Sequence, residues 1–206
     1  MIELNLPVTN EQIENLKIGD LVSLNGIILT ARDRAHKYFM ENFIEVEQVP
    51  QSEAELHKQL LRDLRGGAIY HCGPVVREED GKWKFVAAGP TTSIREEPYQ
   101  SQVIRHFGLK AVIGKGGMGE KTLAACKKYK TVYIHAIGGA ASLIAHSVKE
   151  VLDVYKIEFG IPEAIWKIRV EDFQATVTMD AHGNSLHKQV EEESAKVFNN
   201  LTFGQK

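Results

Sequence analysis

Short apolar segments alternate with helix-like segments through the middle of this 206-residue chain, and this alternation constrains the fold more than any other feature. A sheet strand that leads into a helix, repeated several times, predicts a layered α/β domain. We expect a single domain over residues 1–206, with helices flanking the sheet. Strands are predicted at 68–72, 83–88, 109–113 and 131–137, and helices at 93–107, 120–129 and 138–147.

Two glycine turns predict that the sheet is mixed rather than purely parallel. Asn25-Gly26 separates two apolar segments, a pattern typical of a β-hairpin. Asp80-Gly81 is a second such turn, which we expect to join strand 68–72 to strand 83–88. Because hairpins pair strands antiparallel, the sheet cannot be all parallel. Two more strands are predicted at 165–170 and 176–179, and helices 52–64 and 186–198 are expected to be packing elements.

The composition argues against several classes of function. With 25 Lys+Arg against 27 Asp+Glu, the net charge is −2, which does not favour a nucleic-acid surface. No apolar run reaches the roughly 20 residues of a membrane span, and the acidic start of the chain is unlike a signal peptide. Cys72 and Cys126 are too few for a disulfide framework or a four-thiolate metal site. We therefore expect a cytoplasmic protein.

The segment Gly114–Gly119 matches the dinucleotide fingerprint G-x-G-x-x-G between an apolar strand and a helix. The following strand ends in Ala136-Ile137-Gly138, without an acidic residue for a ribose hydroxyl, and little sequence remains for a second nucleotide-binding half. Glycine N–H groups and the Lys115 ammonium group can instead bind a carboxylate or phosphate near a helix N-terminus. A plain strand-to-helix turn is the other interpretation.

Two further segments place polar side chains at predicted strand ends. Gly89-Pro90 is followed by three hydroxyls, one of which can cap a helix, and Arg95 falls in the first helical turn. A cation there opposes the helix dipole unless an anion neutralises it. In the segment 31–36, Arg32 follows a strand, Asp33 is a possible cap, and His36 is suited to proton transfer. A solvated arginine and a histidine at the edge of the core are the alternatives.

Two histidine motifs have ambiguous roles. His71 precedes Cys72 at a strand end, without a second pair of metal ligands nearby. Asp180 and His182 are one residue apart after another strand, either as an acid/base pair or as a polar turn.

Seven short motifs occur along nearly the whole chain in the order of one family. They are Gly19-Asp20 with Asn25-Gly26, Thr30-Ala31-Arg32-Asp33-x-Ala-His36, His71-x-Gly-Pro74, Gly89-Pro-Thr-Thr-Ser93-x-Arg95, Gly114-Lys-Gly-Gly-Met118, Gly160-Ile-Pro-Glu163 and Asp180-x-His-Gly-Asn-Ser185. The chain resembles the β subunit, or C-terminal domain, of class I iron–sulfur fumarate hydratase and L-tartrate dehydratase. Departures from the pattern include Glu96, where the family often has Met, Ala140 in place of Cys, and Gln174-Ala175 in place of Gly-Pro.

The resemblance implies a swivelling β/β/α domain and a hydro-lyase activity. The reaction is the reversible hydration of fumarate to L-malate, or alternatively the dehydration of tartrate. A 4Fe-4S cluster is expected in a partner α subunit that binds it through three cysteines, with no metal site in this chain. The expected assembly contains two α and two β subunits, and a β homodimer forms when the chain is alone. No nucleic-acid or membrane partner is expected.

The resemblance also implies roles for individual residues. Arg32, Arg95 and Lys115, with the backbone of Gly114 and Gly116, are expected to bind the dicarboxylate substrate. Paired cations suit carboxylates and stabilise the charge that forms when a C–H proton leaves. Thr91 and His36 are the expected catalytic residues, and Thr91 takes part in proton transfer. His71, Asp180 and His182 are possible further members of the site. The alternatives are a nucleotide-binding module that uses the 114–119 loop and a non-catalytic scaffold.

Overall fold

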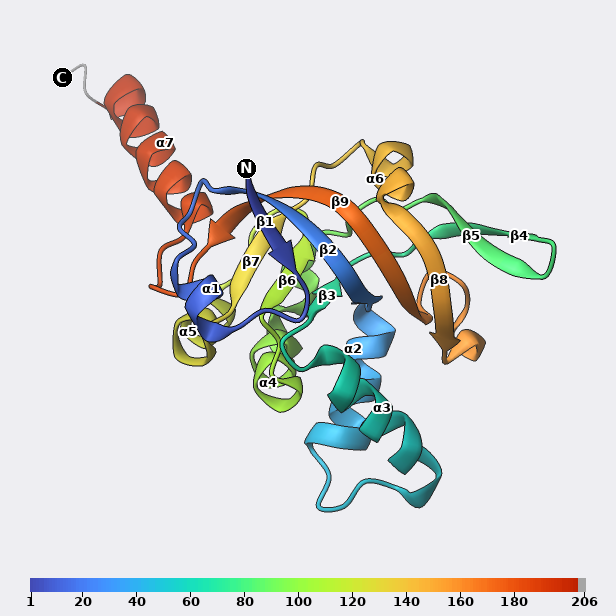
Figure 1. Cartoon of the computed structure of the whole chain (residues 1–206). Helices are drawn as coiled ribbons and strands as arrows, with labels where there is room; N and C mark the ends of the chain where they lie inside the picture. The colour runs from blue at the N-terminus through green and yellow to red at the C-terminus, as the bar shows by residue number, and fades with distance from the viewer. Residues whose placement is uncertain (204–206) are drawn as a thin grey trace.

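The computed structural model describes residues 1–203, and a seven-stranded mixed sheet forms its centre (Figure 1). Neighbouring strands run in the order β1 (Ile2–Asn5), β2 (Leu21–Thr30), β3 (Ala68–Tyr70), β6 (Ala111–Gly114), β7 (Val132–His135), β9 (Ile165–Met179) and β8 (Val148–Tyr155). The first five of these are parallel to one another. The long strand β9 is antiparallel to β7, β8 and β2, so its pairing with β2 closes the sheet on itself.

Both faces of the central strands are buried, which explains their continuous apolar sequence. Consecutive residues point to opposite faces, so that Ile28 joins the core inside the curved sheet and Leu29 joins the core beneath the helices. The inner core includes Trp166 and Phe173, and the outer core includes Phe39 and Phe107. In Figure 1 the helices on the outer face are α2 (Asp33–Phe39), α3 (Ala54–Leu64), α4 (Glu97–Phe107) and α5 (Glu120–Tyr129).

The predicted hairpin at Asn25-Gly26 is wrong. The segment is one continuous strand, β2, with a register shift between Leu24 and Gly26. Gly26 has φ of +118°, and a Cβ there would lie 2.9 Å from the carbonyl oxygen of Leu6. The glycine therefore serves a bulge and a close backbone approach rather than a turn.

The second glycine turn, Asp80-Gly81, does form a hairpin, but the prediction that strand 68–72 is its first strand is wrong. Asp80-Gly81 joins β4 (Val75–Glu79) to β5 (Lys82–Ala87), which form a separate two-stranded sheet. The mixed sheet is confirmed, although its antiparallel pairs come from β9. That strand runs unbroken through the two short strands predicted at 165–170 and 176–179, and its neighbour β8 was not predicted.

Among residues 1–203, the shortest and the longest α-helices lie near the two ends of the chain. Near the N-terminus lies α1 (Asn10–Glu14), and α6 (Ala141–Ser147) lies across the sheet from α2–α5. The C-terminal α7 (Leu186–Phe203) stands away from the sheet in Figure 1. Its apolar side chains are exposed, so it is not the packing element that was predicted, whereas α3 buries Leu60 and Leu64 as expected. Over residues 1–203 there is no helix with the length and apolar character needed to traverse a bilayer.

Candidate functional site

One edge of the sheet collects most of the predicted site residues. Because β2, β3, β6 and β7 are parallel and in register, their carboxyl ends meet at this edge. Arg32 lies two residues beyond β2, His71 directly follows β3, and Lys115 directly follows β6. We call this region the strand-end site.

The segment 90–93 brings Thr91 into the strand-end site. The Thr91 N–H donates to the carbonyl oxygen of His71 at 2.7 Å, and the Lys115 N–H donates to the carbonyl oxygen of Thr91 at 3.2 Å. The Ser93 N–H in turn donates to the carbonyl oxygen of Lys115 at 2.9 Å. The segment therefore lies between the ends of β3 and β6, and it holds Thr91 beside Lys115.

Two glycines leave space for the segment 90–93 and for the Lys115 side chain. A Cβ at Gly114 would lie 1.8 Å from Ser93 Oγ, which contacts His71 Nδ1 and accepts a hydrogen bond from the Tyr133 hydroxyl. A Cβ at Gly138 would lie 3.0 Å from Lys115 Cδ, so the lysine side chain runs over that glycine. Gly114 therefore has a packing role that the sequence pattern did not reveal.

Both arginines of the site are held by carboxylates of this chain. Arg32 Nη2 lies 3.3 Å from Glu163 Oε1, and the Arg32 side chain is 21% exposed. Arg95 is hydrogen-bonded to Asp33 and is 53% exposed. The half-exposed pair of Arg95 with Asp33 is worth about 1 kcal/mol or less, so it holds Arg95 only weakly. Asp33 was expected to cap the helix, but its carboxylate binds Arg95 and α2 has no side-chain cap.

His36 and His71 lie behind the strand-end site and are fully buried. His36 Nδ1 is 3.0 Å from the Arg32 carbonyl oxygen, and both Nε2 atoms contact Oε1 of Gln100. Burial lowers the pKa of His36, while burial and the neighbouring His36 lower the pKa of His71 to about 3. Both rings are therefore neutral at pH 7 and have their nitrogens engaged inside the protein.

The helix start beside the glycine loop is occupied by an internal carboxylate. Glu97 accepts hydrogen bonds from the N–H groups of Gly119, Lys121 and Thr122 and from the Thr122 hydroxyl. These are the donors that a phosphate at the start of α5 would need. Because Glu97 occupies these donors, the nucleotide-binding interpretation lacks a phosphate site at the start of α5, whereas a role for Lys115 in binding a carboxylate stays a prediction.

Asp180 and His182 lie away from the strand-end site. They follow β9, whose antiparallel direction puts its carboxyl end at the opposite edge of the sheet. The Asp180 carboxylate accepts from the N–H groups of His182 and Asn184 and from the Asn184 side chain. Burial disfavours its ionised form, but these hydrogen bonds outweigh burial and lower its pKa. The polar-turn interpretation therefore fits this motif.

The side chains of this chain do not fit an iron–sulfur cluster. Among residues 1–203 no group of three or more His, Cys, Asp or Glu is placed to hold a metal ion. Cys72 and Cys126 are both buried, and burial raises the pKa of each thiol to about 12. Cluster ligation needs several thiolates close together, which these two residues do not supply.

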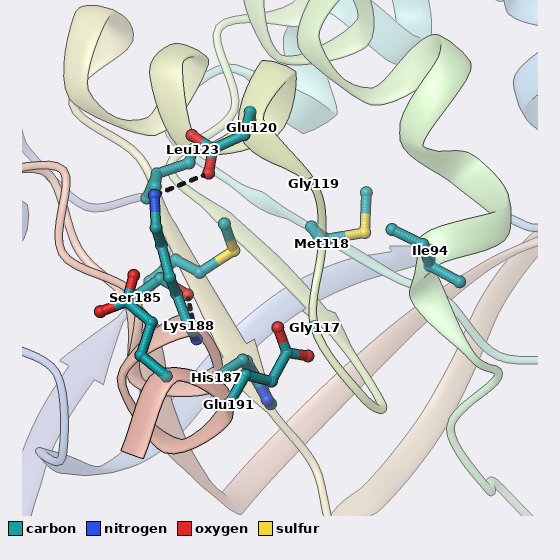
Figure 2. A pocket seen from close by; sticks show the side chains of 12 residues that line it. Ile94, Gly117, Met118, Gly119, Glu120, Leu123, Ser185, His187, Lys188 and Glu191 are labelled. Carbon is teal, nitrogen blue, oxygen red and sulfur yellow. Dashed lines mark hydrogen bonds and ion pairs between the residues drawn. The ribbon is translucent and has the colours of Figure 1, made fainter. Parts of the chain in front are cut away.

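A cavity of about 580 Å³ lies next to the strand-end site but is separate from it. Figure 2 shows its lining, which includes Met118 and Gly119 from the glycine loop and His187 and Lys188 from the base of α7. Arg32, Thr91, Arg95 and Lys115 are not among its lining residues. The cations of the strand-end site therefore do not contribute to this cavity.

Several site residues were missed from the sequence. Glu163 was recognised only as part of a motif, and Gln100 had no signal because it lies inside a helix. Glu96 was noted as a departure from a family pattern, but its burial follows from the η3 turn (Ser93–Glu96), which precedes α4. The position of Glu96 directly after Arg95 was the only available signal.

These features define an α/β domain with three cationic side chains, Arg32, Arg95 and Lys115, near one edge of its sheet. A family model described as Fumarase C-terminus matches residues 1–190, and the chain belongs to this family. The chain is 52% identical to a putative class I fumarate hydratase of Geobacillus stearothermophilus over 94% of its own length, but it spans only 35% of that relative.

Two other relatives are close to this chain in length. It is 37% identical to the L(+)-tartrate dehydratase subunit beta of Escherichia coli K12, over 89% of this chain and 85% of the relative. It is 38% identical to a putative subunit of the same name from Methanocaldococcus jannaschii, over 94% and 95% of the two chains. The first of these three relatives is thus named as a fumarate hydratase, and the other two are named as beta subunits of a tartrate dehydratase.

Proposed function

We propose that this chain is the β subunit of a class I fumarate hydratase, with a site completed by an α subunit. The observation that carries the proposal is the convergence of Arg32, Thr91 and Lys115 at one sheet edge, with Arg95 following Thr91 in the η3 turn. The 52% identity to a putative class I fumarate hydratase favours fumarate over tartrate as the substrate.

The cations have a defined task in this proposal. Arg32 and Arg95 exchange Glu163 and Asp33 for the two carboxylates of the substrate, and Lys115 adds a third positive charge. Guanidinium groups bind carboxylates through paired hydrogen bonds, which fixes the substrate's orientation. The same charges stabilise the negative charge that develops on a carboxylate when the adjacent C–H proton is removed.

Thr91 is the proposed proton-transfer residue. Its backbone is fixed by hydrogen bonds to His71 and Lys115, so its hydroxyl is held at the same edge as the cations. A threonine hydroxyl is a weak base, and it needs the Lys115 charge and a carboxylate from the partner to act. His36 has both ring nitrogens engaged, so we assign it a positioning role through the Arg32 carbonyl.

A partner subunit is proposed because the strand-end site is open and has an apolar rim. Ile94, Ile137 and Leu143 are 50%, 66% and 72% exposed. Ile137 and Leu143 line a common hollow, and the segment that precedes Ile94 contacts the start of α6, where the Ala88 N–H donates to the Ala141 carbonyl oxygen. Exposed apolar side chains around a polar site are typical of an interface. Covering them also removes water, which strengthens the charge interactions in the site.

The iron–sulfur cluster is assigned to that partner. When bound, the cluster supplies Lewis-acid activation of the substrate hydroxyl, whereas the residues of this chain bind carboxylates and move the C–H proton. We further propose the swivelling β/β/α fold for this domain and an assembly of two α and two β subunits.

The test is anaerobic co-purification of the tagged chain from its native host, followed by assays with fumarate and with tartrate. We expect an iron–sulfur partner in equal amount and malate formation from fumarate by the pair. Turnover of tartrate alone would change the substrate and keep the mechanism. A chain that recovers no stoichiometric partner, or binds NAD(H) at micromolar concentration, contradicts the proposal.

A further inference from the structure

Glu96 is a fully buried carboxyl group directly behind the strand-end site. Neither of its carboxyl oxygens has a hydrogen-bond partner. His36 Nδ1 lies 3.9 Å from Glu96 Oε2, which is too long for a hydrogen bond. A buried carboxylate without hydrogen bonds is strongly disfavoured, so this side chain is held as the neutral acid.

The surroundings of Glu96 reinforce its neutral form. Burial, together with the negative charges of Asp33 and Glu163, raises the pKa of Glu96 to about 8, although Arg95 and Arg32 oppose the shift. His36 adds no positive charge, because burial lowers its own pKa. The charged and titratable groups that face Glu96 are thus Arg32, Asp33 and His36 at the start of α2, Arg95 on its own turn, and Glu163 from the segment before β9.

A second unpartnered group lies in the same cluster. Arg32 uses Nη2 for Glu163, while its Nε–H is buried without an acceptor. Arg32 and Arg95 carry two positive charges, and Asp33 and Glu163 carry two negative charges. The cluster is therefore neutral while Glu96 is protonated. Ionised Glu96 adds one negative charge, which attracts both guanidinium groups inward and repels a dicarboxylate.

We propose that Glu96, as a protonated carboxyl group, is a positioning residue that keeps Arg32 and Arg95 available for the substrate's carboxylates. Its ionisation withdraws the two arginines, so that substrate binding weakens in alkaline solution. This inference rests on the proposed function, because it requires that the two arginines bind a dicarboxylate.

The first test is the pH dependence of KM and kcat for the complex of this chain with its partner. In the wild type we expect KM to rise about tenfold per pH unit above pH ~8, with a smaller change in kcat. Glu96→Gln and the volume-matched, apolar Glu96→Met cannot ionise, so their KM should stay flat over that range. Glu158→Gln is the matched control, since Glu158 is 64% exposed and lies outside the cluster. Its profile should match the wild type.

The second test follows the carboxyl group itself and needs no activity. Infrared difference spectra of the full chain should contain a protonated-carboxyl C=O band that disappears near pH 8 and is missing in Glu96→Gln and Glu96→Met. A wild type without this band at neutral pH overturns the proposal, as does an active complex in which Glu96→Gln keeps the wild-type KM profile. A complex that turns over no dicarboxylate while the band titrates instead overturns the proposed function, and with it the role of Glu96 towards substrate.

Discussion

The edge of the sheet at the carboxyl end of β9 and the strand-end site differ in how their buried polar side chains are hydrogen-bonded. At the edge beyond β9, the Asp180 carboxylate accepts three hydrogen bonds from His182 and Asn184. At the strand-end site, the Glu96 carboxyl and Arg32 Nε are buried without partners. Buried polar groups are nearly always satisfied, and exceptions need an explanation. The comparison indicates that the first edge is built for stability and the second for binding.

The largest expected effect tests the binding edge. Arg95→Ala in the complex should lower kcat/KM by about 100-fold or more, roughly 2.7 kcal/mol of transition-state stabilisation. The free energy of unfolding should change little, because Arg95 is half exposed and its ion pair with Asp33 is weak.

Arg169→Ala is the matched control for Arg95. Arg169 is 45% exposed and pairs with Glu150, but it lies on β9 between β2 and β8. Steady-state kinetics should separate the two variants clearly. Equal losses, or a loss below about tenfold for Arg95→Ala, would contradict the role of Arg95 in substrate binding.

The second prediction concerns the stability edge. Asp180→Ala should lower the free energy of unfolding by about 2 kcal/mol, because three part-buried hydrogen bonds lose their acceptor. Activity per folded molecule should stay unchanged. Urea unfolding of the isolated chain and kinetics of the complex measure the two quantities, and a stable but inactive variant would return Asp180 to the candidate site.

The Asp180 carboxylate should also make the free energy of unfolding depend on pH. Its folded-state pKa is lowered, so its contribution to stability is complete above the ordinary Asp value and is lost as the pH falls through the folded-state value. Asp180→Asn should therefore flatten the pH dependence of stability in acid. An unchanged acid limb would show that another group controls it.

Sequence reasoning recovered the parts that depend on local pattern. The helix at 120–129 matches α5. The parallel strands β2, β3 and β6 bring Arg32 and Lys115 to one edge, whereas Thr91 reaches that edge through the insertion of segment 90–93, which the sequence analysis did not predict. It failed where a long-range contact decides the outcome. The pair Asn25-Gly26 is typical of a turn, but the Leu6 backbone packs closely against Gly26 and the strand forms a bulge there instead. The burial of Glu96 and the capping of α5 by Glu97 depend on how α4 packs, which no local pattern contains.

Glu97 gives a further prediction, because its carboxylate has hydrogen-bond partners whereas that of its neighbour Glu96 has none. Glu97→Ala removes the acceptor at the start of α5 and should lower the free energy of unfolding by about 2 kcal/mol. Glu120→Ala is the control, since its carboxylate also lies in the first turn of α5 but is 76% exposed and bound to Lys188. Thermal unfolding of both variants measures the difference, and equal Tm values would mean that Glu97 does not cap the helix.

The smallest predicted effect compares two glycines with nearly the same backbone conformation. Gly116 has φ of +75° and Gly81 has φ of +72°, and a Cβ at either position meets no atom within 4 Å. Replacement by Ala should therefore cost each site a similar strain of about 1 kcal/mol. Gly81 lies in the β4–β5 turn, whereas Gly116 directly follows Lys115.

The two glycine variants should thus lose similar stability but differ in KM. Both should lose about the same unfolding free energy, but only Gly116→Ala should raise KM, by about two- to fivefold, because strain at Gly116 moves the Lys115 backbone that bonds Thr91 and Ser93. Measuring urea unfolding and KM for both variants separates local strain from displacement of the site. If the two variants had the same KM, the backbone at Gly116 would not control the position of Lys115. The lysine would then act through its flexible side chain alone, and the strand-end site would depend on its arginines for orientation.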